Sequence, residues 1–205
     1  MSVSSDRIPH LLRLLGAALL LPWPSGKKGG WRKWKHLQLT DMDERSYQAK
    51  LERAANIGVA LGQVSNGLVT IDLDHDTYVE AFLAANPPLR DTLRTTAARG
   101  CNIWLRCGDG YPASRKLKNP SGQEIGEWRA DGNQTIISGN HPEGVLYRFV
   151  VEKPVITVRY EAIIWPEPIT PPSCYREYES KRVREDEVVG VCVVLMGLVY
   201  QKLEI

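Results

Sequence analysis

Hydrophobic residues recur in the first part of the chain at spacings that alternate between those of a helix and those of a strand. Residues 8–15 place leucine and isoleucine on one helical face, and the short apolar run 19–21 is ended by Pro22, which has no amide hydrogen to donate. Residues 41–55 repeat the helical pattern, and residues 57–62 form another apolar run. The pattern therefore predicts two consecutive helix–strand pairs.

A strong turn signal separates two of the apolar runs. Residues 57–62 and 68–73 lie on either side of Ser65-Asn66-Gly67. Asn-Gly tolerates the positive φ angles that a type I′ turn requires, so we expect a β-hairpin here.

The remainder of the chain changes from one further helix to strands. Thr77 and Glu80 have the spacing of a capping box, which predicts a helix that ends before Pro87. Further strands are predicted at residues 102–107, 124–129, 134–138 and 145–151. Because helices come first and antiparallel strands dominate later, the sequence favours an α/β (α+β) fold of two subdomains.

Prolines cluster near the end of the chain. Four of them fall within residues 165–173, which is typical of a linker or of an edge crossing of the surface. We therefore expect one folded domain over residues 1–164, followed by a proline-rich linker and a short tail over residues 165–205.

The composition is that of a globular protein, with 43% hydrophobic and 24% charged residues among 205. The formal net charge of +2 is close to neutral, so any nucleic-acid binding would depend on local basic patches. The four cysteines form no CxxC pair, which argues against a zinc site or a disulfide framework and favours a reduced, cytoplasmic setting. Residues 11–21 contain an arginine, and the apolar run 188–200 is shorter than the ~20 residues of a membrane-spanning helix, so we expect no membrane segment.

Two acids end a β-prone run of the sequence. Residues i and i+2 of a strand share a face, so the carboxylates of Asp72 and Asp74 project together, with Cα atoms roughly 6–7 Å apart. Carboxylates this close repel each other, and a bound Mg²⁺ or Mn²⁺ would remove the repulsion while orienting a triphosphate. The alternative is that both are ordinary strand-end residues, one of which caps the next helix.

A second acidic segment, residues 126–132, strengthens the case for chemistry. Glu127 and Arg129 share one face of a predicted strand. The acid could complete a metal site, and the guanidinium could pair with phosphate. That division of roles suits phosphoryl transfer.

Cations alternate with tryptophans in residues 27–35. Cations neutralise phosphates and indoles stack on unpaired bases, so this segment is a candidate nucleic-acid contact. A solvated loop whose tryptophans pack on the core is the alternative. A second cationic stretch precedes residues 126–132, in what reads as a polar loop. The candidate DNA contacts are Lys27, Lys28, Trp31, Arg32, Lys33, Arg115, Lys116 and Lys118.

The order of several motifs resembles a known family. The bifunctional DNA primase/polymerase (Prim-Pol) domain of the archaeo-eukaryotic primase superfamily has a similar succession, seen here in residues 58–62, 67–74, 99–102, 126–132 and 141–147. The resemblance implies a small N-terminal α/β unit packed on an RRM-like, mostly antiparallel sheet, with the active cleft between them. The family occurs in replication proteins of plasmids, phages and mobile elements.

The resemblance also implies roles for individual residues. The catalytic ligands of Mg²⁺ or Mn²⁺ would be Asp72, Asp74 and Glu127, although aspartate is commoner in the family at the third position. The nucleotide contacts would be Arg99, Asn102, Arg129 and His141. Asn102 takes the place of a family histidine that touches the phosphates. Asparagine can donate a hydrogen bond but cannot become cationic, so Arg99 or His141 would supply the missing charge.

We therefore expect a metal-dependent DNA primase/polymerase that uses a single-stranded DNA template and dNTPs or NTPs, with a separate helicase as a further partner. The alternative is a catalytically weak, primase-like module that binds DNA or recruits a helicase. The asparagine at position 102 supports that alternative, and the three acids argue against it. A glycosyltransferase also uses a strand-end DxD pair, but it would leave residues 126–132 and 141–147 unexplained.

Overall fold

The computed structural model describes residues 6–23, 34–108 and 110–172. The α-helices in this part of the chain are α1 (Arg7–Leu15), α2 (Arg45–Arg53) and α3 (Asp76–Ala85). The strands are β1 (Leu20–Trp23), β2 (Asn56–Ala60), β3 (Leu68–Leu73), β4 (Arg94–Thr96), β5 (Cys101–Cys107), β6 (Arg115–Lys118), β7 (Glu124–Arg129), β8 (Gln134–Ser138), β9 (Arg148–Val151) and β10 (Ile156–Val158).

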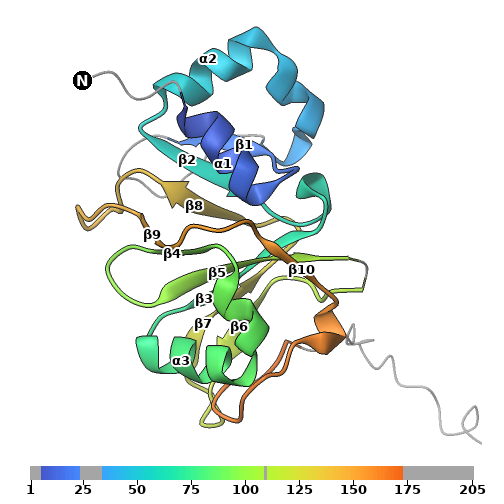
Figure 1. The fold of residues 1–205 in the computed structure, drawn as a ribbon, viewed down its shortest axis with the longest axis vertical. Helices are drawn as coiled ribbons and strands as arrows, with labels where there is room; N and C mark the ends of the chain where they lie inside the picture. Colours follow the sequence, from blue (N-terminus) through green and yellow to red (C-terminus); the bar gives the residue numbers. More distant parts are fainter. Residues whose placement is uncertain (1–5, 24–33, 109, 173–205) are drawn as a thin grey trace, which may run out of the picture. The chain divides into compact units, whose positions relative to one another are not determined.

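The strands form two sheets. The smaller has the order β1-β2-β8, and the larger has the order β6-β7-β3-β5-β4-β9, with β10 paired in parallel to the end of β5. All other pairings are antiparallel. Figure 1 shows α1 and α2 beside the smaller sheet and α3 against the larger one. The expected mixed α/β class with largely antiparallel sheets is confirmed.

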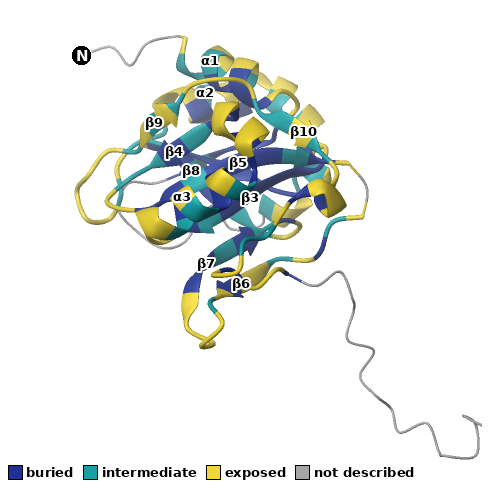
Figure 2. Ribbon diagram, turned by 60° about the horizontal axis from the view of Figure 1, so that its bottom comes forward, coloured by how far each residue is buried: buried dark blue, intermediate teal, exposed yellow. Residues whose placement is uncertain are grey.

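The larger sheet turns one apolar face towards α3 because the side chains of β3 alternate between its two faces. Val69, Ile71 and Leu73 are buried in a core that also contains Val79 and Phe82 of α3. Strand geometry then directs the intervening side chains to the opposite face, towards the smaller sheet. Figure 2 shows β3 and β5 as buried strands between helices whose outer surfaces are exposed.

A second core joins the smaller sheet to this opposite face. It contains Leu15 of α1, Leu51 of α2 and Val59 of β2, together with Trp104 of β5. The indole of Trp104 is fully buried and its Nε1 donates a hydrogen bond to the hydroxyl of Thr95 at 2.9 Å. The two sheets are thus held together by packing on one side of β5, which leaves the polar end of β3 facing β8.

The predicted hairpin between residues 57–62 and 68–73 is wrong. Asn66 and Gly67 do have positive φ angles, 54° and 74°. However, β2 and β3 belong to different sheets and are joined through a 3₁₀ turn at Gln63–Ser65 and a single bridge between Gly62 and Leu68. A Cβ on Gly67 would lie 2.0 Å from the carbonyl oxygen of Cys107, so this glycine serves a close crossing to β5 rather than a two-residue turn.

Two helix predictions also need correction. The third helix begins at Asp76 with His75 as its N-cap and no side-chain capping bond, so Thr77 and Glu80 do not form a capping box. The pattern over residues 41–55 is divided into a 3₁₀ turn, Leu39–Asp43, and α2. Glu44 separates the two segments because its ψ of 126° is extended and interrupts the helical backbone.

The proline-rich segment packs on the larger sheet's core as far as it is described. Ile169 is 2% exposed, and the ring of Trp165 lies 5.5 Å from that of Phe82. The amide of Thr170 donates a hydrogen bond to the carbonyl of Lys118 at 2.8 Å. In the described part of the chain, none of the helices has both the length and the apolar character needed to span a bilayer.

Candidate active site

A pocket of about 250 Å³ is lined by strands of both sheets and by two loops. Strands β3, β5 and β7 contribute from the larger sheet, and β8 contributes from the smaller one. Six of the residues selected from the sequence line it: Asp72, Asp74, Arg99, Asn102, Arg129 and His141. They come from five segments of the chain, so the fold brings together positions up to about 70 residues apart.

The floor of the pocket is set by the register of three central strands. Asp72 of β3 is directly opposite Asn102 of β5 on one side and Glu127 of β7 on the other. Opposed residues of an antiparallel pair have Cβ atoms about 4.5–5.5 Å apart. A Cβ on Gly126 would lie 2.0 Å from the carbonyl oxygen of Asp72, so the residue before Glu127 must be small for β7 to approach β3.

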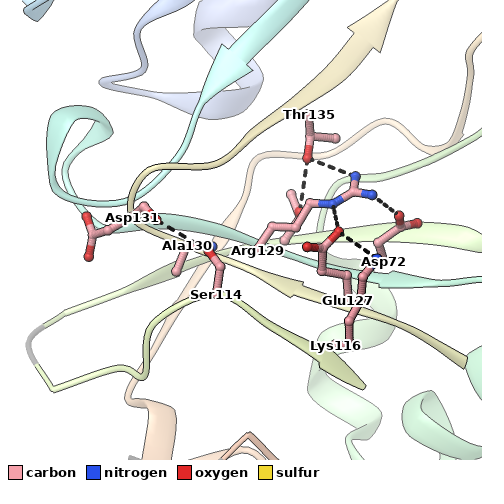
Figure 3. A network of polar contacts seen from close by, with 9 residues as sticks. Asp72, Ser114, Lys116, Glu127, Arg129, Ala130, Asp131 and Thr135 are labelled. Atoms are coloured by element: carbon pink, nitrogen blue, oxygen red, sulfur yellow. Dashed lines mark hydrogen bonds and ion pairs between the residues drawn. The ribbon is translucent and has the colours of Figure 1, made fainter. Parts of the chain in front are cut away.

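The guanidinium of Arg129 joins the acids of this row (Figure 3). Its Nη2 lies 2.6 Å from Asp72 Oδ2, and its Nε donates to Glu127 Oε2 at 2.9 Å. Its Nη1 donates at 3.3 Å to the hydroxyl of Thr135, which belongs to the smaller sheet. Arg129 therefore connects the acids of the larger sheet to Thr135 of the smaller sheet. The ammonium of Lys116 is a second cation near Glu127, at 3.7 Å.

Burial sets the electrostatics of the row. Burial raises the pKa of Asp72 above its ordinary value, Asp74 and Glu127 raise it further, and the charge of Arg129 opposes these effects. Burial alone would lower the pKa of Arg129, but Asp72 and Glu127 more than reverse this, so the guanidinium stays charged. The surroundings of Asp72 thus disfavour its charged form, and the charges of Arg129 and Lys116 offset this in part.

Three further predicted residues line the pocket: Asp74, Arg99 and Asn102. Asp74 is exposed just beyond the end of β3, and Arg99 is exposed in the turn between β4 and β5. Asn102 is partly buried, and its Oδ1 has no hydrogen-bond partner among the described residues. These side chains leave polar groups available to a ligand in the pocket.

A small hairpin, residues 139–147, carries His141 to the pocket. The amide of His141 donates to the carbonyl of Val145 at 2.7 Å, and the amide of Tyr147 donates to the carbonyl of Gly139 at 3.0 Å. The rings of His141 and Tyr147 meet edge to face, 5.8 Å apart, and both residues line the pocket. Burial, and then the charge of Asp72, raise the pKa of Tyr147, so its hydroxyl stays protonated.

Comparison with known families identifies this arrangement. The family model described as bifunctional DNA primase/polymerase, N-terminal, matches residues 10–171. The chain belongs to the Prim-Pol family. No individual curated protein matches the sequence. The match includes every pocket residue named above, and DNA primase/polymerase activity is the activity that membership implies.

Prim-Pol chemistry generally calls for divalent metal, and the donor chemistry of the pocket suits it. Carboxylate oxygens are the ligands that Mg²⁺ and Mn²⁺ prefer, and Asp72 and Asp74 both face the pocket. Glu127 lies opposite Asp72 but does not line the pocket, and its Oε2 is engaged by Arg129. Among the described residues, no three His, Cys, Asp or Glu side chains are grouped as a metal site. Arg129 engages one carboxylate oxygen of Asp72 and one of Glu127, so a cation bound by these acids would compete with its guanidinium.

The expected DNA contacts lie partly inside and partly outside the described residues. Lys27, Lys28, Trp31, Arg32 and Lys33 lie outside the described residues. Arg115, Lys116 and Lys118 are exposed, but they lie on β6, the edge strand of the larger sheet, and not in the expected loop. Trp34 packs beside the buried Leu19, Leu21 and Ala60, as the alternative interpretation of the tryptophans anticipates.

Thr135 and Tyr147 are among the pocket residues that sequence reasoning missed. Thr135 alternates inward on β8, but its contact with Arg129 depends on how the two sheets face each other. Tyr147 ends the segment that carries the family resemblance, and this was the available signal for it.

Proposed function

We propose that this Prim-Pol domain is a Mg²⁺- or Mn²⁺-dependent nucleotidyltransferase that copies a single-stranded DNA template during replication of a plasmid, phage or mobile element. The observation that carries the proposal is the convergence of Asp72 and Asp74 with Arg99, Arg129 and His141 in one pocket. Acids that suit a cation and cations that suit a triphosphate are the two groups that template-directed nucleotidyl transfer requires.

The acidic side would hold the metal. Asp72, Asp74 and Glu127 are the proposed ligands, with Glu127 joining once Arg129 releases it. When bound, divalent metal lowers the pKa of the attacking hydroxyl and stabilises the departing pyrophosphate. Arg129 pairs with both Asp72 and Glu127 and offsets part of their charge.

The cationic side would orient the nucleotide. A guanidinium pairs with phosphate oxygens through two parallel hydrogen bonds, so Arg129, once free of the carboxylates, and Arg99 at the rim are the proposed clamps on the triphosphate. His141 adds a donor from the opposite wall. Asn102 replaces the family's histidine with an uncharged amide, which makes these three residues the proposed source of positive charge.

The template would enter over the edge of the larger sheet. The exposed cations Arg115, Lys116 and Lys118 on β6 lie on the side of the row where Glu127 is found. Cations along such an edge neutralise successive phosphates of a strand. The segment 27–33 is the proposed second contact, dNTPs or NTPs are the substrates, and a separate helicase is a further partner.

Primer extension tests the proposal. With primed single-stranded template, labelled dNTPs and Mn²⁺, the chain should incorporate nucleotide, and Asp72→Ala should lower incorporation at least about 1000-fold because a metal ligand is lost. Asp91→Asn is the matched control, since Asp91 is an exposed acid paired with Lys153 outside the pocket. Incorporation that survives Asp72→Ala would refute the assignment.

One observation favours the alternative of a catalytically weak, primase-like module. Arg129 engages both Asp72 and Glu127, and position 102 lacks a cationic side chain. Such a module would retain binding to single-stranded DNA but show no incorporation with either metal, and Asp72→Ala would leave its DNA affinity unchanged.

A further inference from the structure

Asn56 makes an unusual pair of contacts with a distant part of the chain. It lies at the start of β2 and is 1% exposed. Its Nδ2 donates to the carbonyl of Asn140 at 2.9 Å, and its Oδ1 accepts from the amide of Asn140 at 2.7 Å. One buried side chain thus satisfies both backbone groups of a residue 84 positions away, as a neighbouring strand would.

The element held in this way is the hairpin 139–147. Asn140 is the residue immediately before His141, and it forms the bridge with Leu146 that closes the hairpin. Residues 142–146 are exposed, so the tip receives little support from packing. The place of the hairpin therefore depends on its base, where Asn56 binds.

Gly139 completes the contact from the other side. Its φ is 117°, and a Cβ at this position would lie 1.9 Å from Asn56 Oδ1. The backbone can approach the amide of Asn56 this closely only without a side chain. Asn56 and Gly139 thus form one complementary unit made of residues that the sequence separates widely.

We propose that Asn56 is a positioning residue that fixes His141 and Tyr147 in the nucleotide pocket by holding the backbone of Asn140. This inference rests on the proposed function, in which His141 contacts the triphosphate. Asn56 does not line the pocket and acts through the hairpin.

Asn86 provides a matched control. It is also buried, its Nδ2 donates to the carbonyl of Ile164 at 2.6 Å, and its Oδ1 accepts from the amide of Ile164 at 2.9 Å. The same pair of bonds is made here, with one further bond from Nδ2 to the carbonyl of Phe82 at 2.9 Å, but neither Asn86 nor Ile164 lines the nucleotide pocket. Asn86→Ala therefore removes an equivalent clamp without moving the hairpin.

The kinetic test compares Asn56→Ala, Gly139→Ala and Asn86→Ala in primer extension. Loss of positioning should raise the KM for dNTP about five- to tenfold with kcat changed less than about twofold, because nucleotide binding is what the hairpin supports. Asn86→Ala should leave both constants unchanged. Because Asn56 acts through His141, adding Asn56→Ala to His141→Ala should bring no further loss. An additive loss, or an equal rise in KM with Asn86→Ala, would overturn the inference.

Hydrogen exchange separates this inference from the proposed function. In Asn56→Ala and Gly139→Ala, the amides of His141 and Tyr147 should exchange at least about tenfold faster, whereas in Asn86→Ala they should keep the wild-type rate. Hydrogen exchange does not depend on enzymatic activity. A protein that shows no polymerase activity can therefore still reveal whether Asn56 holds the backbone of Asn140. Unchanged exchange in both clamp variants would refute the clamp even if wild-type incorporation is normal. Gly139→Ala also retains a test if Asn56→Ala does not fold.

Discussion

The surroundings of Asp72 disfavour the charged form of its carboxyl. Burial raises its pKa first, and the charges of Asp74 and Glu127 add to the effect. The single charge of Arg129, 2.6 Å away, offsets only part of this. This electrostatic cost is what a cation bound at the pocket would relieve.

Replacement of Asp72 by asparagine should therefore stabilise the protein at neutral pH. An acid whose pKa is higher in the folded state loses stability as pH rises from its unfolded pKa, near 3.8, through the raised folded pKa. Asp72→Asn removes this loss, so its Tm at pH 8 should exceed that of the wild type by roughly 2–4 °C, the effect of about 1 kcal/mol in a domain of this length. The difference should vanish below pH 4, where the aspartate is protonated.

Asp91→Asn serves as the control for this measurement. Asp91 is exposed, and its hydrogen bond with Lys153 lowers the pKa of its carboxyl, which is the opposite direction. Its removal should leave the Tm at pH 8 unchanged or slightly lower, since exposed ion pairs contribute little. A Tm for Asp72→Asn at or below the wild-type value at pH 8 would contradict the electrostatic account.

At the scale of elements, the junction of β3 and β7 decides whether the acids can meet. The backbone at Gly126 passes so close to β3 that a Cβ would lie 2.0 Å from the carbonyl of Asp72. Gly126→Ala should separate the strands and destabilise the domain by more than about 1 kcal/mol in urea unfolding. Incorporation should fall with stability because Asp72 and Glu127 lose their register.

Gly132→Ala distinguishes close approach from backbone strain. Gly132 also has a positive φ, 74°, but nothing lies within 4 Å of a Cβ there. Its replacement should cost less than that of Gly126 and leave incorporation close to wild type. Equal losses in both variants would mean that strand contact at Gly126 is unimportant.

The sequence predicts individual elements better than their pairing. The bounds of β7 and β8 agree with the predicted residues 124–129 and 134–138, because alternation and flanking glycines are local signals. The prediction of a hairpin at Asn66-Gly67 was wrong because positive φ angles also occur where the chain crosses from one sheet to the other. The strand β6, with the sequence RKLK, reads as a polar loop because three of its four side chains face solvent at a sheet edge.

For the molecule as a whole, motif order predicted much of the pocket, and tertiary contact supplied the rest. Resemblance to a family selected six residues that the structure brings together. The link from Arg129 to Thr135 depends on how the two sheets face each other, whereas the contact of Asn56 with Asn140 continues the pairing of β2 with β8 within the smaller sheet. No spacing in the sequence encodes either relation, so these residues become visible only in three dimensions.

Charge distribution over the whole molecule gives a last prediction. The formal net charge is only +2, so the proposed binding of single-stranded DNA would depend on local cations, and Arg115 and Lys118 on β6 are exposed candidates. Each lost phosphate contact reduces the slope of log K against log salt by about 0.7 for single strands. The double replacement Arg115→Ala and Lys118→Ala should therefore lower the slope by about 1.4.

Lys153→Ala is the control. It removes an exposed cation paired with Asp91 and should leave the slope unchanged. Fluorescence anisotropy measures both slopes between about 50 and 200 mM salt, where DNA affinity falls steeply with salt concentration. Equal slopes for the double variant and the wild type would place the DNA elsewhere on the molecule.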